Sequence, residues 1–164
     1  MRFTIKEKFF SLGQSFAIRD DQGNVAYKVE GRLLSLKDKL TMRDASGAKV
    51  ARIEQKLLSL VKAYRVLQDG AVIATIKKRP FTILRDRFII DVPGPNDLIV
   101  TGAILDHDYT ITMGRETVAT VSKKWVSLTD TYGIEVRDGQ DPILPLAAAI
   151  VVDLVIHERS GNDD

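Results

Sequence analysis

The sequence contains no cysteine. This absence excludes disulfides, zinc–thiolate sites, iron–sulfur clusters and thiol nucleophiles. The sequence also lacks an excess of charge of either sign, because 24 Lys and Arg side chains balance 22 Asp and Glu side chains and leave a formal charge of +2. A dedicated nucleic-acid binder usually carries a strong basic excess, so we expect no nucleic acid among the partners.

Motifs of catalysis are missing as well. There is no Gly-x-Ser-x-Gly elbow and no Gly-rich phosphate loop, and the two histidines are His107 and His157. Asp106, His107 and Asp108 resemble half of a metal site. They fall between two predicted strands, where a polar hairpin turn is the simpler interpretation. We therefore expect no enzyme, no metal site and no cofactor.

The N-terminal residues include no apolar run long enough for a signal peptide, and Arg2, Lys6, Glu7 and Lys8 place charges among them. The composition, 45% hydrophobic and 28% charged, is that of an ordinary globular protein, and 164 residues suit one domain with its own core. We expect a cytoplasmic monomer, with the periphery of a membrane as the alternative location.

The dominant pattern that the sequence does contain is alternation with a period of two. In "YGIEV", Tyr132, Ile134 and Val136 share one face of a strand, because successive side chains of a strand point to opposite faces. Similar runs recur between turns that contain Gly, Asp or Asn. We predict about twelve strands, at 2–9, 15–20, 25–31, 38–44, 49–56, 61–68, 71–78, 86–92, 98–105, 108–113, 117–124 and 131–137.

The turns repeat at nearly constant spacing. Gly23, Gly47 and Gly70 are 24 and 23 residues apart, and a similar strand follows each of them, so the repeat unit is a strand pair. Many short antiparallel strands at regular spacing predict a mainly β (α+β) protein, built as a sandwich or a closed barrel. Closure is favoured because it removes the exposed edges of a long sheet.

The C-terminal segment follows a helical pattern. Residues 143–152 carry no charge, and their alanines favour a helix over a strand. We predict a helix over about 143–158, with Asp141 as its N-cap and Pro142 at its first position, or with a start at Pro145.

This helix is too short and too polar at its centre to span a bilayer. From Pro145 to Glu158 it has 14 residues and a length of about 21 Å, whereas a span takes about 20 apolar residues, and Asp153 lies inside the run. We expect no transmembrane span. An apolar helix must be buried, and a barrel of about twelve strands is too wide for side chains alone to fill. We therefore predict that the helix fills the barrel.

Twelve strands followed by one hydrophobic C-terminal helix resemble the Tubby C-terminal-like superfamily, which includes the LURP-one-related proteins, the phospholipid scramblases and the Tubby domains. The resemblance covers essentially the whole chain, and the LURP-one-related branch fits best in size and repeat pattern. It implies a single Tubby-like barrel domain over residues 1–160 around a central helix, followed by a short polar tail over 161–164.

The stretch 129–158 is similar to the scramblase C-terminus. A Thr-Asp motif, an aromatic-Gly-Ile run and an apolar helix with an internal Asp occur in the same order, here at Thr129, Asp130, Tyr132, Gly133, Ile134 and Asp153. In scramblases the acidic segment before the helix is proposed to bind calcium. This chain departs from that pattern, because Asp130, Asp138 and Asp141 are too sparse to supply the roughly six to eight oxygens that calcium takes.

Two sets of polar residues are candidate sites. Asp153 and His157 lie four residues apart and hence on one face of the helix. They either contact a ligand or, as we favour, form a buried polar pair that hydrogen-bonds to the barrel rim or its backbone. The other set is a basic cluster. Its members are Lys77, Lys78, Arg79, Arg85, Arg87, Lys123 and Lys124.

The basic cluster supports the leading functional hypothesis, a non-enzymatic module that binds an anionic, phosphoinositide-like lipid surface or a protein partner. With Phe81 or Trp125 beside them, such cations each contribute about 1 kcal/mol near an anionic surface. Tubby domains, which the fold resembles, bind phosphoinositides through a basic surface. The plainer interpretation of the cluster is a solvated barrel exterior.

Two alternative functions remain at this point. A phospholipid scramblase-like lipid transporter requires an exposed hydrophobic helix and calcium. An enzyme or carrier would hold a small ligand in the barrel, where a central helix leaves little room.

Overall fold

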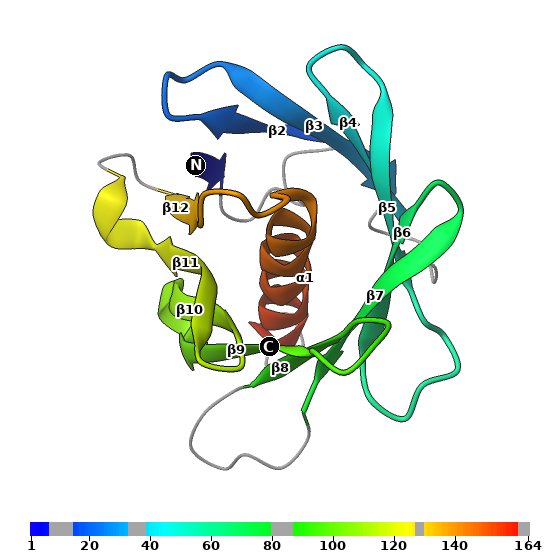
Figure 1. The fold of residues 1–164 in the computed structure, drawn as a ribbon. Coiled ribbons are helices and arrows are strands. Elements are labelled where there is room, and N and C mark those ends of the chain that lie inside the picture. Colours follow the sequence, from blue (N-terminus) through cyan, green and yellow to red (C-terminus); the bar gives the residue numbers. More distant parts are fainter. Residues whose placement is uncertain (7–14, 33–38, 80–86, 127–129, 161–164) are drawn as a thin grey trace.

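The computed structural model describes residues 1–6, 15–32, 39–79, 87–126 and 130–160, with only the backbone of Arg32 and of residues 158–160. Within these residues twelve strands form a closed barrel around one long helix (Figure 1). The strands are β1 (Arg2–Lys6), β2 (Ser15–Asp20), β3 (Val25–Arg32), β4 (Lys39–Asp44), β5 (Lys49–Gln55), β6 (Ala63–Gln68), β7 (Ala71–Lys78), β8 (Phe88–Asp91), β9 (Leu98–Ala103), β10 (Asp108–Met113), β11 (Glu116–Ser122) and β12 (Thr131–Val136). The helix is α1 (Ile143–Ser160), and the 3-10 helices η2 (Ile104–Asp106) and η3 (Lys123–Trp125) follow β9 and β11.

The barrel closes between the first and the last strand. Each strand pairs antiparallel with its neighbours in the chain, and β1 pairs with both β2 and β12. At the closure Arg2 lies opposite Glu135, and the two side chains form an ion pair of 2.7 Å. The closed antiparallel barrel predicted from the sequence is thus confirmed. Within the described residues the predicted strands agree with the observed ones to within two residues at each end; the predicted strand residues 7–9, 38 and 86 lie outside the described residues.

The wall of the barrel is apolar on its inner side. Every strand contributes at least one inward apolar residue that is no more than 1% exposed, in keeping with the strand alternation. These residues are Ile5, Ile18, Val29, Met42, Ile53, Val66, Ile76, Ile90, Val100, Ile111, Val121 and Ile134. Most of them are β-branched, which suits a pleated surface.

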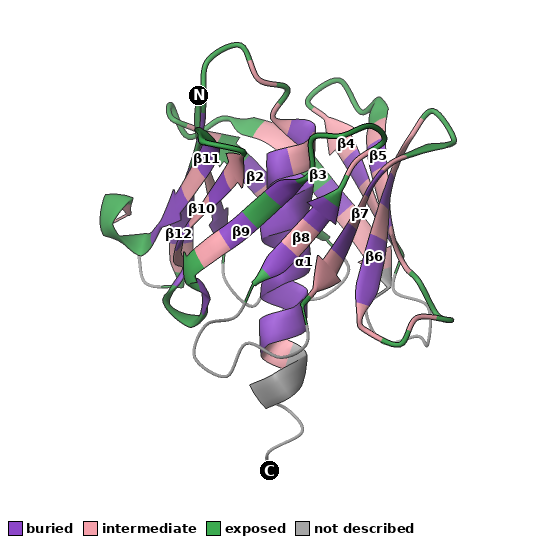
Figure 2. Ribbon diagram, turned by 60° about the horizontal axis from the view of Figure 1, so that its bottom comes forward, coloured by how far each residue is buried: buried purple, intermediate pink, exposed green. Residues whose placement is uncertain are grey.

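Helix α1 fills the space that these side chains leave. Twelve strands spaced by about 4.8 Å and tilted by about 40° enclose a radius of about 12 Å. A helix with its side chains takes up about 5–6 Å of that radius, which leaves one layer for the side chains of the wall. Accordingly, every residue of α1 from Leu146 to Ile156 is buried (Figure 2). The prediction of a barrel that encloses its own C-terminal helix is confirmed.

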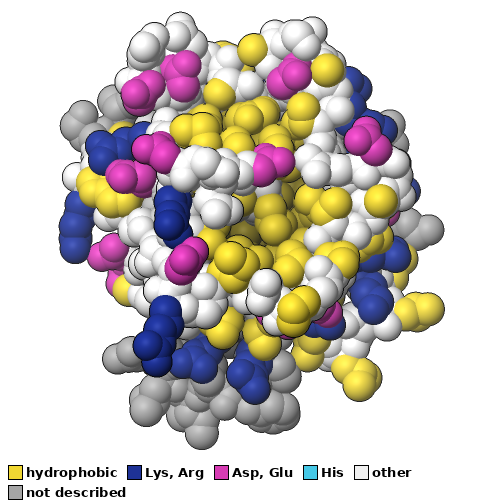
Figure 3. All heavy atoms as spheres, in the orientation of Figure 1, with side chains coloured by type: hydrophobic (Ala, Val, Ile, Leu, Met, Phe, Trp, Pro, Cys, Tyr) yellow, Lys and Arg dark blue, Asp and Glu magenta, His cyan; other side chains and the backbone are white. Residues whose placement is uncertain are grey.

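Helix α1 begins at Ile143, one residue after Pro142, where the first of the two predicted starts placed the first helical position. The Asp141 carboxylate accepts a hydrogen bond of 2.9 Å from the backbone N–H of Ile143, and the carbonyl of Pro142 accepts one of 3.0 Å from the N–H of Leu146. Asp141 therefore caps the helix, as an N-cap aspartate does. The helix ends at Ser160 rather than near 158. Around its first turn, hydrophobic side chains gather in the mouth of the barrel (Figure 3).

The repeat seen in the sequence is a repeat of hairpin turns. Asp20 and Asp44 each accept hydrogen bonds from the backbone N–H groups two and four residues later. Gly23 and Gly47 follow at φ of 84° and 87°, a conformation that glycine adopts without strain. The same kind of turn thus connects β2 to β3 and β4 to β5.

The connections between strands alternate between the two ends of the barrel. The described connections that follow odd-numbered strands lie at the end where α1 finishes, because the strands are antiparallel and neighbours in the chain are neighbours in the barrel (Figure 2). We call this end the helix-exit rim. Its described parts are residues 56–62, 104–107 and 123–126, together with Arg79 and Arg87 at the ends of the segments next to β7 and β8.

Candidate functional site

A polar cluster lies between α1 and the barrel wall near the helix-exit rim. Asp153 is completely buried, and its Oδ1 atom lies 2.8 Å from Nε2 of His107, which is 3% exposed. His157, one turn later on α1, approaches the same Oδ1 atom at 3.4 Å, and its Nδ1 atom lies 2.9 Å from the backbone oxygen of Asp153. The predicted pair of Asp153 and His157 is therefore part of a set of three residues. The closest side-chain contact of Asp153 is with His107 of the barrel wall and not with His157.

The backbone of the connection between β9 and β10 turns His107 inward. His107 has φ of 50° and ψ of 46°, in the left-handed region, and its N–H donates to the carbonyl of Ile104 at 3.1 Å. Its ring stacks on that of Tyr132, with centroids 4.6 Å apart. The sequence indicated a polar turn here. The turn exists, but His107 is buried and not at the solvent-facing surface of the turn.

The charge of Asp153 is set by opposing effects. Burial acts to raise the pKa of the Asp153 carboxyl, but the hydrogen bonds and charges of His107 and His157 outweigh it and hold the pKa below its usual value. Burial and the negative charge of Asp153 raise the pKa of the Tyr109 hydroxyl. Asp153 is thus an ionised carboxylate beside a neutral phenol.

Gly102 allows Tyr109 to occupy its place beside the helix. These two residues are paired between β9 and β10. Gly102 has φ of 139°, and a Cβ atom there would come within 2.7 Å of both the Asp108 carbonyl and the Tyr109 Cα. Only glycine fits a backbone that approaches its neighbour so closely.

The buried cluster holds the helix and does not present a reactive group to solvent. Asp153 Oδ2 and the Tyr109 hydroxyl are buried and have no hydrogen-bond partner in the part of the chain that the structure describes. A substrate would reach them only if the helix or the wall moved. The cluster is therefore best described as a polar link between α1 and the connection from β9 to β10.

The outer surface of the helix-exit rim carries part of the predicted basic cluster. The N–H of Arg79 donates to the carbonyl of Arg87 at 2.9 Å, so β7 and β8 bring these two exposed side chains to one edge. The N–H of Lys78 donates to the carbonyl of Lys62 at 3.3 Å, which joins this edge to the connection between β5 and β6.

The remaining predicted cations are more dispersed. Lys77 points along the outer wall, with its Nζ atom 3.6 Å from Asp91 Oδ2. Lys123 and Lys124 are exposed in η3 at the helix-exit rim, but β9 and β10 separate them from β8. Arg85 lies outside the described residues.

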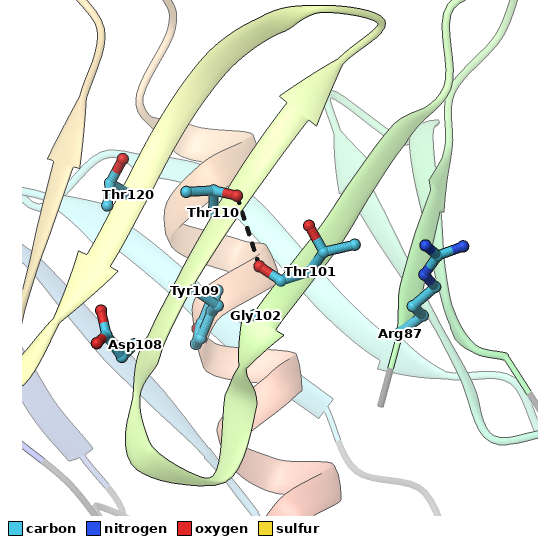
Figure 4. A pocket seen from close by; sticks show the side chains of 7 residues that line it. All are labelled: Arg87, Thr101, Gly102, Asp108, Tyr109, Thr110 and Thr120. Carbon is cyan, nitrogen blue, oxygen red and sulfur yellow. Dashed lines mark hydrogen bonds between the residues drawn. The ribbon is translucent and has the colours of Figure 1, made fainter. Parts of the chain in front are cut away.

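An open pocket of about 410 Å³ lies on the outer wall. It separates one group of cations, Arg79 and Arg87, from the other group, Lys123 and Lys124 in η3. Arg87 and Asp108 line it, and Asp108 Oδ2 lies 3.1 Å from Nζ of Lys124. Between them runs a row of threonines from three adjacent strands, which Figure 4 shows. The row consists of Thr101, Thr110 and Thr120, which are paired in register across β9, β10 and β11.

The sequence interpretation missed three features that the structure shows. The row of threonines depends on strand register, which the alternating pattern does not give. His107 as the partner of Asp153 was missed because the two are 46 residues apart. The third feature, exposed leucines at the helix-exit rim, does leave a signal in the sequence. Two apolar residues followed by Ser-Leu occur at 9–12, 33–36, 57–60 and 125–128.

Twelve antiparallel strands that close around a buried C-terminal helix define this protein as a Tubby-like barrel. The chain belongs to the LURP-one-related family, because the model of that family matches residues 1–153. The uncharacterized protein YxjI of Bacillus subtilis (strain 168) is 35% identical to it over 153 residues, which are 93% of this chain and 92% of the relative.

The fold is also similar to that of an Arabidopsis thaliana protein whose X-ray structure is known. The TM-score is 0.69 at 21% sequence identity, and the match covers 94% of this chain and 90% of the plant protein. At this identity the similarity shows a shared fold. Within the described residues, none of the helices has the length and hydropathy that crossing a bilayer would require.

Proposed function

We propose that this protein is a non-enzymatic binding module that docks on an anionic lipid surface through the cations of the helix-exit rim. The observation that carries the proposal is the juxtaposition of Arg79 and Arg87, two exposed arginines that a backbone hydrogen bond of 2.9 Å holds together. Lys123 and Lys124 extend the positive charge along the same rim. Each such cation contributes about 1 kcal/mol at an anionic membrane surface, and salt weakens the attraction.

The pocket beside Arg87 supports the choice of a phosphorylated headgroup as the ligand. A guanidinium binds a phosphate through paired N–H donors, so Arg87 is the proposed phosphate contact. The hydroxyls of Thr101, Thr110 and Thr120 both donate and accept hydrogen bonds, and Asp108 accepts them, as the hydroxyls of a polyol headgroup require. The volume of about 410 Å³ lies within the range of small-molecule sites.

The filled barrel supports an exterior site over an interior one. A scramblase-like transporter needs an exposed hydrophobic helix, whereas α1 is buried from Leu146 to Ile156. The helix also occupies the centre of the barrel, where an enzyme or carrier would hold a small ligand. Neither alternative therefore gains an observation in its favour.

Co-sedimentation with vesicles tests the proposal. At low salt we expect the protein to bind vesicles that contain phosphoinositides and to bind neutral phosphatidylcholine vesicles far less. The variant Arg79→Gln/Arg87→Gln removes two charges from the helix-exit rim and should weaken binding about ten-fold or more. The control Lys49→Gln/Arg115→Gln removes the same charge from exposed residues at the opposite end of the barrel and should bind as the wild type does.

Competition separates the headgroup pocket from a diffuse electrostatic attraction. A soluble inositol phosphate should displace the protein from vesicles if the pocket beside Arg87 holds the headgroup. Equal binding to neutral and anionic vesicles would remove the lipid proposal. Binding to no vesicle at all would also overturn the lipid proposal and would favour a protein partner at this rim.

A further inference from the structure

The connection between β5 and β6 presents leucines to solvent. Leu57 is 51% exposed, Leu58 is 98% exposed and Leu60 is exposed completely. The connection is not frayed at its base, because the N–H of Lys56 donates to the carbonyl of Ala63 at 2.8 Å. Figure 2 shows it leaving the ends of β5 and β6 at the helix-exit rim. Three leucines exposed within four residues form a contiguous apolar tip, and such tips mark interaction sites.

Positively charged residues flank this apolar tip. Lys56 and Lys62 stand on either side of the leucines, and the carbonyl of Lys62 accepts the hydrogen bond from the N–H of Lys78. The tip is therefore continuous with the edge that carries Arg79 and Arg87. Leu105 in η2, 62% exposed, adds a further apolar side chain to the same rim.

The shape and the charge together select the kind of partner. A protruding loop with an apolar end and cationic flanks matches the boundary between the acyl chains and the phosphates of an anionic bilayer. Apolar side chains enter the acyl boundary there, while long lysines keep their ammonium groups at the headgroup level. A protein partner would instead have to offer a groove with an acidic border.

We infer that Leu57, Leu58 and Leu60 insert into the interfacial layer of an anionic phospholipid bilayer, with Lys56 and Lys62 at the level of the lipid phosphates. The inference rests on the proposed docking of the helix-exit rim on anionic lipid and adds an apolar anchor to it. The anchor acts in addition to charge, so it persists at salt concentrations that screen the arginines.

A single label can report on the anchor, because the chain has no cysteine of its own. Leu58→Cys carrying an environment-sensitive fluorophore should show a blue-shifted emission on phosphatidylserine-containing vesicles. A quencher attached to the acyl chains should quench it. Val72→Cys with the same label is the control, since Val72 is 40% exposed at the opposite end of the barrel, and its emission should not change.

A second variant measures the contribution of the leucines to binding. Leu58→Ser/Leu60→Ser leaves all charges in place and should lower the partition coefficient on anionic vesicles about ten-fold or more. Val25→Ser/Val72→Ser, a matched pair of partly exposed apolar residues at the opposite end, should bind as the wild type does. Both variants change exposed side chains, so the midpoint of thermal unfolding should stay that of the wild type. This measurement checks that folding is retained.

The outcomes separate the anchor from the docking itself. Vesicle binding that is unaffected by Leu58→Ser/Leu60→Ser, or an unshifted label on bound protein, overturns the anchor and leaves docking by charge intact. Failure to bind any vesicle overturns both. A wild-type dimer that Leu58→Ser/Leu60→Ser converts to a monomer would assign the leucines to a contact between copies and overturn the anchor.

Discussion

His107 Nε2 and Asp153 Oδ1 lie 2.8 Å apart, in a buried hydrogen bond between the barrel wall and the helix inside it. The other described side chains of α1 up to Ile156 are apolar. Apolar contacts have no direction, so they fill the barrel without fixing how the helix is rotated. A hydrogen bond to an ionised group is directional and stronger than a neutral one. We infer that this bond sets the rotation and depth of the helix.

Breaking this bond from one side should be costly. Asp153→Leu removes the carboxylate from this buried hydrogen bond, and we expect it to lower the free energy of unfolding by about 2–4 kcal/mol. His107→Leu should cost a similar amount, because the buried Asp153 carboxylate loses its closest hydrogen-bond partner and keeps only His157 at 3.4 Å. The double variant should lose clearly less than the sum of the two, since neither polar group is then left alone. Urea-induced unfolding measures all three, and strictly additive losses would contradict the link.

Acid should weaken the protein partly through Asp153. The folded-state pKa of this carboxyl lies below its unfolded value of about 3.9, so its ionised form stabilises the fold above that pH. That contribution is lost as the pH falls through the folded pKa. Below about pH 4 the stability of the wild type should therefore fall more steeply than that of Asp153→Asn. Parallel pH profiles between pH 2 and 5 would show that the carboxyl does not titrate in this way.

Tyr109 should tolerate the loss of its hydroxyl but not of its ring. No described residue forms a hydrogen bond with this buried hydroxyl. We expect Tyr109→Phe to leave the free energy of unfolding unchanged or to raise it by up to about 1 kcal/mol. Tyr109→Ala, the control, should cost about 3–5 kcal/mol, because it empties a packed site. A loss above about 1 kcal/mol in Tyr109→Phe would reveal a hydrogen bond of the hydroxyl.

Gly102 and Gly23 provide a matched test of close backbone packing. Both have positive φ, but a Cβ atom at Gly102 would lie 2.7 Å from the Asp108 carbonyl, whereas at Gly23 it would meet nothing within 4 Å. Gly23→Ala should cost about 1 kcal/mol for its conformation alone. Gly102→Ala should cost about 1–3 kcal/mol more, because the strands must separate. Equal losses in thermal unfolding would mean that β9 and β10 adjust without strain.

The strands and the helix of this protein could be predicted from its sequence, whereas the arrangement of its candidate site could not. Alternation such as that of Tyr132, Ile134 and Val136 reflects one buried face, and it is visible along a single strand. The cap at Asp141 is equally local. By contrast, Thr101, Thr110 and Thr120 meet only because three strands pair in one register. Nothing within any one strand specifies that register.

The basic cluster shows the same division. The hairpin of β7 and β8 brings Arg79 and Arg87 together, and their closeness in the chain already suggested it. Whether Lys123 and Lys124 lie beside them depends on the two strands between β8 and β11. The structure places the two groups on either side of an open pocket, and their joint action on a lipid surface stays a proposal.

By itself, the sequence determined that this protein is a barrel built from repeated strand pairs and that its apolar C-terminal helix lies inside. Those properties follow from short-range periodicity and from the need to bury an uncharged helix. Only the tertiary structure decided which wall residue meets Asp153 and which loops share a rim with Leu58 and Arg87. These relations join residues far apart in the chain, and they arise from the closure and register of the whole barrel.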